Sequence, residues 1–286
     1  MSPKFRYTLG ALNIVGVPTL LFFTFINFYS SPLGGLVGVG LAAVLLAVVL
    51  WLLSRSPMWP ERSGAGWRWV VAGLLWGAGV SFTFVMVGGV PIITITNRLD
   101  MTLFAASFGG AYPEEIAKFL GVGVILFSFR ALNRPWHGLM TGAVIGLGFE
   151  LAENIMYGAS GAVEDPNSDL TGVLGMWGLR LVLGPGLHVI FSALAGWGLG
   201  LALFTAGRSR AWRAGVAGGW LFVAFSLHFL WNTMWPQEWM LLTNYLVLSL
   251  IMYPLFIWVW VRAHRAARAD ASYAWTERPL TSLPSP

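Results

Sequence analysis

The sequence predicts an all-α fold: a polytopic membrane bundle of about eight transmembrane helices, with both termini in the cytoplasm. Hydrophobic residues make up 57% of the 286 residues and charged residues only 10%, whereas a soluble domain averages about 25% charged residues. Apolar stretches of about 20 residues, the length that spans a bilayer, recur along the chain. The basic residues gather in every second loop between these stretches. A soluble enzyme, a secreted domain and a DNA-binding protein are therefore all excluded as classes.

The first three spans form an N-terminal region, residues 1–98. The first, Leu9–Tyr29, follows Lys4 and Arg6. It is longer than the apolar core of a signal peptide and lacks an A-x-A cleavage pattern, so we expect a retained anchor. The second and third spans, Leu33–Leu53 and Trp67–Val87, are apolar over a membrane-spanning length.

Five further spans form the expected core, residues 99–262. They are Met101–Phe129, Gly138–Tyr157, Gly175–Phe204, Ala214–Trp235 and Met240–Val261. Pro113 is expected to start a helix segment within the first of them, and Gly184-Pro185-Gly186 to interrupt the third. Glycine pairs four residues apart, such as Gly142–Gly146 and Gly196–Gly200, predict close helix packing. Residues 263–286 are expected to be a disordered cytoplasmic tail.

The basic residues orient the bundle. Only Arg98 lies in a loop on the opposite side, and two further cations, Lys118 and Arg180, lie within spans. Because cytoplasmic loops are rich in Lys and Arg, the termini are predicted to be cytoplasmic. The net charge of +5 then follows from topology, so we expect a multi-pass protein of the cell membrane, with the lipid bilayer as a partner and no nucleic acid. The basic residues on the cytoplasmic side are Lys4, Arg6, Arg55, Arg62, Arg68, Arg130, Arg134, Arg208, Arg210, Arg213, Arg262, Arg265, Arg268 and Arg278.

Several ionisable side chains lie inside apolar spans. A charge at the bilayer centre costs about 2.5–3.5 kcal/mol on insertion scales, so intramembrane charges indicate a functional site. Their spacing places them on shared helix faces, because residues three or four apart are neighbours on a helix. The candidate residues are Glu114, Glu115 and Lys118 in the fourth span, Glu150, Glu153 and Asn154 in the fifth, His188 in the sixth, and His228 and Asn232 in the seventh.

The charges of this set suggest a bound cation. Four glutamates outnumber Lys118, and the excess is resolved by protonation or by a cation. Two histidines with carboxylates are suitable zinc ligands that leave a position for water. No cysteine and no H-E-x-x-H motif is present, so a zinc site would have to be assembled from several helices. Both alternatives, Zn²⁺ and no cofactor, stay open.

The ordered set of motifs resembles the PrsW family of intramembrane proteases. It comprises E-E-x-x-K at Glu114, F-E-x-x-E-N at Phe149, the isolated His188, and H-x-x-W-N at His228. The resemblance covers roughly Leu99 to Trp235. It implies peptide-bond hydrolysis in or near the membrane, a relation to the CAAX-prenyl endopeptidases, and a membrane-protein substrate such as an anti-sigma factor.

Two mechanisms fit the matched residues. Without a metal, Glu114 or Glu115 would act as general base on water, while His228 and Asn232 polarise the scissile carbonyl. With a metal, a glutamate of the first motif would still take the proton of water. The ligands would then be His188, His228 and one of Glu150 and Glu153. In both schemes Lys118 holds the paired carboxylates, and the expected catalytic set is Glu114, Glu115, Lys118, Glu150, Glu153, Asn154, His228 and Asn232.

Two other classes remain as alternatives. Intramembrane Glu and His chains also relay protons or bind ions in transporters, and a non-catalytic scaffold could keep the same fold. The depth of the residues gives a further expectation for a protease. At 1.5 Å per residue, Glu150 lies about 18 Å and His228 about 21 Å from the cytoplasmic start of their spans. We therefore expect cleavage past the midplane, near the exported side.

Overall fold

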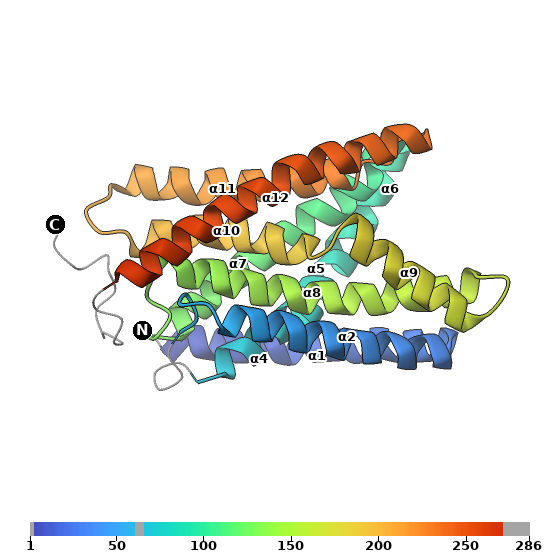
Figure 1. Cartoon of the computed structure of the whole chain (residues 1–286), viewed down its shortest axis with the longest axis horizontal. Helices are drawn as coiled ribbons and strands as arrows, with labels where there is room; N and C mark the ends of the chain where they lie inside the picture. Colours follow the sequence, from blue (N-terminus) through green and yellow to red (C-terminus); the bar gives the residue numbers. More distant parts are fainter. Residues whose placement is uncertain (1–2, 61–65, 271–286) are drawn as a thin grey trace.

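The computed structural model describes residues 3–60 and 66–270, and these form an α-helical bundle without strands. Figure 1 shows the helices running roughly along one long axis, with the start of the first helix and the end of the last helix at the same end of the bundle. The predicted all-α fold is confirmed for this part of the chain. Arg62 and Arg278, as well as residues 271–286 of the predicted tail, lie outside it.

The N-terminal region contains two long helices and one composite helix. The long helices are α1 (Pro3–Ser30) and α2 (Pro32–Ser54). The composite helix consists of α4 (Arg68–Leu75), the π-helical turn η1 (Trp76–Ser81), α5 (Phe82–Phe84), a second π-helical turn η2 (Val85–Gly89) and α6 (Val90–Arg98). Apolar side chains cover most of these helices, and many of them are exposed, as lipid contact requires.

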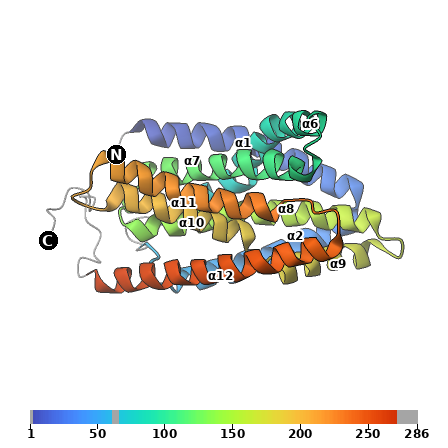
Figure 2. The same cartoon turned by 90° about the horizontal axis from the view of Figure 1, so that it is seen from above.

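The remaining helices build the core around α8. They are the short 3₁₀ turn η3 (Thr102–Phe104), the π-helical turn η4 (Ser107–Ala111), α7 (Tyr112–Ser128), α8 (Pro135–Glu164), α9 (Asp169–Leu183), α10 (Leu187–Phe204), α11 (Arg210–Trp231) and α12 (Glu238–Ala269). Figure 2 shows the same bundle from above, with α8 and α10 among the helices that surround them.

Seven helices of the described part are long and apolar enough to cross a membrane. They match seven of the eight predicted spans. The remaining one, the fourth span Met101–Phe129, is helical from Thr102 to Ser128 and contains the charged residues Glu114, Glu115 and Lys118. The count of eight thus stays a prediction.

Two predicted helix ends are corrected. The seventh span is predicted to run to Trp235, but α11 ends at Trp231, since Pro236 cannot continue a helix and disfavours helical backbone just before it. At the other end of the core, α12 extends to Ala269 rather than Val261. Residues 263–269, which the sequence assigns to a disordered tail, are therefore helical.

The two predicted helix interruptions differ in the structure. Gly184-Pro185-Gly186 separates α9 from α10, with Gly186 at a positive φ of 73°, and the predicted break is confirmed. Pro113 lies in the first turn of α7 as predicted, but the chain before it continues as the π-helical turn η4. Because a proline ring clashes with the carbonyl four residues earlier, a wider turn accommodates Pro113 without a break.

Glycines bring the backbones of α8 and α10 into contact. A Cβ atom at Gly142 would lie 2.0 Å from the Ser192 carbonyl oxygen, and one at Gly146 would lie 2.1 Å from the His188 carbonyl oxygen. These distances are too short for any side chain, so the two positions require glycine. The predicted close packing at Gly142–Gly146 is thus confirmed, and it sets the distance between the two helices that carry Glu150 and His188.

The arrangement predicts which loops share a side of the membrane. The end of α2 and the α7–α8 and α10–α11 connections lie at the end of the bundle where α1 begins and α12 ends (Figure 1), so the basic loops lie together. With a positive-inside orientation, a cysteine at Ser209 should be protected from a membrane-impermeant thiol reagent in intact cells, and a cysteine at Asn167 should be labelled. Because the chain has no native cysteine, each label reports one position. Labelling of Ser209→Cys but not of Asn167→Cys would reverse the orientation.

Candidate functional site

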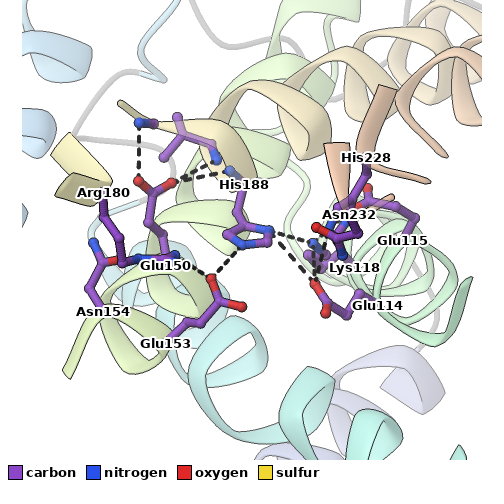
Figure 3. A network of polar contacts seen from close by, with 12 residues as sticks. Glu114, Glu115, Lys118, Glu150, Glu153, Asn154, Arg180, His188, His228 and Asn232 are labelled. Carbon is purple, nitrogen blue, oxygen red and sulfur yellow. Dashed lines mark hydrogen bonds and ion pairs between the residues drawn. The ribbon is translucent and has the colours of Figure 1, made fainter. Parts of the chain in front are cut away.

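Five helices contribute polar side chains to one buried network (Figure 3). The structure brings together all of the candidate residues expected from the sequence. They are Glu114, Glu115 and Lys118 on α7, Glu150, Glu153 and Asn154 on α8, His188 on α10, and His228 with Asn232 at the end of α11.

Lys118 is fully buried and lies between the two carboxylates of its own helix. Its Nζ atom is 2.6 Å from Glu115 Oε1 and 3.3 Å from Glu114 Oε2. It also lies 3.2 Å from His188 Nδ1 and 4.5 Å from the centre of the Phe149 ring. Pairing is needed here because an isolated buried ammonium would be strongly destabilising. The predicted i,i+3 and i,i+4 pairs therefore form.

His228 connects α11 to the same carboxylates. Its Nδ1 atom lies 2.9 Å from Glu115 Oε1, and its Nε2 atom lies 3.1 Å from Asn232 Nδ2. The amide Nδ2 atom only donates. Nε2 is then the acceptor, and Nδ1–H donates to Glu115. The ring also stacks on Phe191, with centroids 5.0 Å apart, so its plane is fixed.

His188 is held from the opposite side by α8 and α9. Its Nε2 atom lies 2.8 Å from Glu153 Oε2, and its Nδ1 atom faces Lys118. The Arg180 guanidinium donates to both Glu153 and Asn154 and lies 4.4 Å above the Tyr157 ring. A carboxylate behind an imidazole orients the ring and increases its basicity. Glu153 therefore positions His188, and Arg180 positions Glu153.

Glu150 occupies the start of α10. Its carboxylate accepts hydrogen bonds from the backbone N–H groups of Gly186, at 3.0 Å, and His188, at 3.1 Å. These donors belong to the first turn of a helix, where unpaired N–H groups and the helix dipole favour an anion. Glu150 thus stabilises the broken end of the helix that carries His188.

Four of these residues could hold a metal ion. One ligand atom from each of Glu114, Glu115, His188 and His228 lies within 4.8 Å of the others, and we call this group the Glu/His cluster. It contains both histidines of the ligand set expected from the sequence, but neither Glu150 nor Glu153. Those two carboxylates are engaged by the α10 backbone and by Arg180.

The chemistry of the Glu/His cluster fits a divalent cation. Imidazole nitrogens and carboxylate oxygens are ligands that zinc accepts. Glu115 Oε2 is buried and has no hydrogen-bond partner in the described part of the chain, although a buried polar atom normally has one. Lys118 and Arg180 balance only two of the four carboxylates of the network, three of which are buried, so two formal negative charges are left, as many as a divalent ion neutralises.

The network borders a cavity of about 600 Å³, which we call the central cavity. Some side chains of the network line this cavity, and others lie behind them. Glu114, His188, His228 and Asn232 line this cavity, together with Glu153, Asn154 and Arg180. Glu115, Lys118 and Glu150 are not among its lining residues. A molecule in the cavity can thus reach Glu114 but not Glu115.

The sequence leaves open whether Arg180 reaches the glutamates, and it gives no sign of two further contributors to the site. An arginine inside an apolar span is itself a signal of a functional site. Tyr253 on α12 donates from its hydroxyl to the Pro185 carbonyl oxygen at 3.1 Å, which braces the broken helix. Gly110 leaves room beside the site, since a Cβ atom there would lie 3.1 Å from Asn232 Nδ2 and 3.3 Å from Glu114 Oε1. Neither of the last two has a local sequence signal.

The geometry predicts which carboxylates bind metal. Elemental analysis of the purified protein should find a divalent ion that Glu115→Gln and His188→Ala remove. Glu150→Gln should retain it, because Glu150 faces the α10 backbone. Glu153→Gln should weaken binding by about 10- to 100-fold, as expected for a residue that orients a ligand. Circular dichroism controls for folding. Loss of metal from folded Glu150→Gln, with retention in Glu115→Gln, would instead support the ligand set expected from the sequence.

Comparison with known proteins supplies the family. Residues 65–259 match the family model described as PrsW family intramembrane metalloprotease. No curated protein and no solved structure matches the chain. The matched region covers more than half of the chain and contains every residue of the polar network. The chain belongs to the PrsW family of intramembrane metalloproteases.

Proposed function

We propose that the protein hydrolyses a peptide bond of a membrane-protein substrate at the Glu/His cluster, with Zn²⁺ as the metal. The observation that carries the proposal is the convergence of two glutamates and two histidines from three helices, with ligand atoms within 4.8 Å of one another, beside a cavity of about 600 Å³. A divalent ion held there would supply Lewis-acid chemistry, which polarises a carbonyl oxygen and makes water more acidic.

Glu114 is the best-placed general base. Of the two adjacent glutamates, it lines the central cavity, so its carboxylate can take a proton from a water molecule beside a bound peptide. Glu115 is 1% exposed and is occupied by Lys118 and His228. A base must lie within hydrogen-bond reach of the proton that it removes, so we assign that role to Glu114, and Glu115 acts as a metal ligand.

Asn232 is the proposed hydrogen-bond donor to the scissile carbonyl. It lines the central cavity and lies beside His228. A donor aimed at the developing negative charge stabilises the transition state more than the substrate. Lys118 holds the two adjacent glutamates in place through its two ion pairs.

The first test removes each adjacent carboxylate. Glu114→Ala should abolish cleavage of a co-reconstituted single-span substrate, since loss of a general base costs about 10²- to 10⁴-fold. Glu115→Ala should also abolish cleavage, because it frees Lys118 and His228. Glu164→Ala, a matched change at the exposed last residue of α8, should cleave like the wild type.

Proteoliposomes allow peptide cleavage and ion flux to be measured in the same samples, so that a protease, a transporter and a scaffold can be distinguished. Chelator should stop cleavage, and added Zn²⁺ should restore it. Cleavage by both Glu114→Ala and Glu115→Ala at the wild-type rate would remove these residues from the reaction. Ion flux without cleavage would identify a transporter, and neither activity would identify a scaffold.

The substrate and the position of the cut are the finer parts of the proposal. Glu150 lies near the middle of α8, and His228 lies three residues before the end of α11, far from the basic α10–α11 loop. In the cell membrane, with the basic loops in the cytoplasm, the site lies toward the exported side. The substrate class implied by the family resemblance is a membrane-anchored regulator such as an anti-sigma factor.

The position of the cut is tested by mass spectrometry of the products from a single-span substrate. The cut should lie at or beyond the middle of the span, toward its exported flank, because His228 lies about 27 Å from the start of α11 at Arg210, at 1.5 Å per residue. A cut on the cytoplasmic flank would show that the proposed depth is wrong.

A further inference from the structure

A second cavity of about 830 Å³ lies next to the central one. We call it the side cavity. Its walls are α6, the segment around η3, and the segment that follows α11. Four residues line both cavities: Ile93, Ala106, Met234 and Trp235. The two cavities therefore adjoin at these four residues, and a ligand bound beside them in the central cavity also borders the side cavity.

The walls of the side cavity are mainly apolar. Its apolar lining residues are Ile93, Leu103, Ala105, Ala106, Met234, Trp235, Pro236 and Met240. The other lining residues, Asn97, Thr102 and Gln237, are uncharged and exposed. An apolar surface of this kind binds apolar side chains through the hydrophobic effect and disfavours charged ones, which would lose their hydration.

Small residues line the way from the side cavity to Glu114, the proposed general base. Ala106 and Gly110 are four residues apart, so they lie on the same face of the helical segment that leads into α7. Ala106 lines the side cavity, and Gly110 lies against Glu114 and Asn232. The absence of a side chain at Gly110 lets a peptide backbone approach these two groups closely.

The two walls of the side cavity are tied together. The backbone N–H of Met234 donates to the Leu103 carbonyl oxygen at 3.0 Å, and the Phe229 ring stacks near Phe104, with centroids 5.8 Å apart. These contacts join the chain before α7 to the chain after α11. The cavity therefore has a defined width, as a pocket that selects by size requires.

We propose that the side cavity is the specificity pocket of the protease, and that it binds an apolar side chain next to the scissile bond of a membrane-protein substrate in an extended conformation. The inference rests on the proposed function. The substrate backbone lies over Ala106 and Gly110, so that the scissile carbonyl reaches Asn232 and the attacking water reaches Glu114. Trp235 and Met234 contact the side chain that the pocket selects.

A substrate series tests the pocket. One single-span substrate is prepared with Ala, Leu, Phe or Asp at each position within a few residues of the mapped cut. The wild type should prefer Leu or Phe over Asp at one position by about tenfold or more, within the range that an apolar pocket supplies. Ala106→Leu should reduce cleavage of the Phe substrate more than that of the Ala substrate, and Trp235→Ala should have the opposite effect.

Two control variants match these changes in chemistry. Trp239→Ala removes an exposed tryptophan four residues from Trp235 that lines neither cavity, and Ala214→Leu enlarges an exposed alanine on α11. Both should keep the wild-type preference. If the wild type cleaves but neither Ala106→Leu nor Trp235→Ala shifts the preference, the pocket is wrong and the proposed function stands. If the wild type cleaves no substrate, the proposed function itself fails.

Cross-linking gives a readout that does not depend on turnover. In the Glu114→Ala background, a cysteine at Thr102, on the rim of the side cavity, should form a disulfide with a substrate cysteine near the cut. A cysteine at Asn167, exposed in the α8–α9 loop, should not. Equal cross-linking at both positions, or cross-linking only between two copies of the enzyme, would overturn the proposal even if a pocket variant failed to fold.

Discussion

Glycines on one face of α8 let its backbone touch that of α10, and the position of the site depends on this contact. The His188 carbonyl lies where a Cβ atom of Gly146 would be, so the start of α10 is fixed against α8. One turn farther along α8, the Glu150 carboxylate accepts the first N–H groups of α10. A larger residue at Gly146 would push α10 away from α8. It would thereby break the hydrogen bonds of Glu150 to the start of α10 and displace His188. Helix packing and helix capping thus support the same histidine.

Burial of charge is the second constraint. Within a bilayer each ionised group needs a partner, because water is not present to solvate it. Lys118 forms ion pairs with the two glutamates of α7, and Arg180 forms one with Glu153. The backbone N–H groups of α10 donate hydrogen bonds to Glu150. Glu115 Oε2 is left unpartnered in the described part of the chain. Among the described residues, the one fully buried carboxylate oxygen of the network without a hydrogen-bond partner therefore lies in the group that could hold a metal.

The network divides into groups that face the central cavity and groups that stand behind them. Glu114, His188, His228 and Asn232 are available to a substrate, whereas Lys118 and Glu115 set their charge and orientation. The side cavity adds apolar surface where the path of small residues leaves the cluster. Polar chemistry is thus confined to one end of the proposed substrate path, which is what selective cleavage within an apolar segment requires.

The sequence by itself determined the local features of this protein. The helices follow from apolar length, the break at Gly184-Pro185-Gly186 from the properties of glycine and proline, and the pairing of Lys118 with its own helix from the spacing of three and four residues. These features depend on neighbours along one helix. Only the tertiary structure decided that Glu150 caps α10, that Arg180 joins Glu153, and that Glu115 meets His228. Such contacts depend on distances between helices, which side-chain packing and glycine contacts set and hydropathy does not encode.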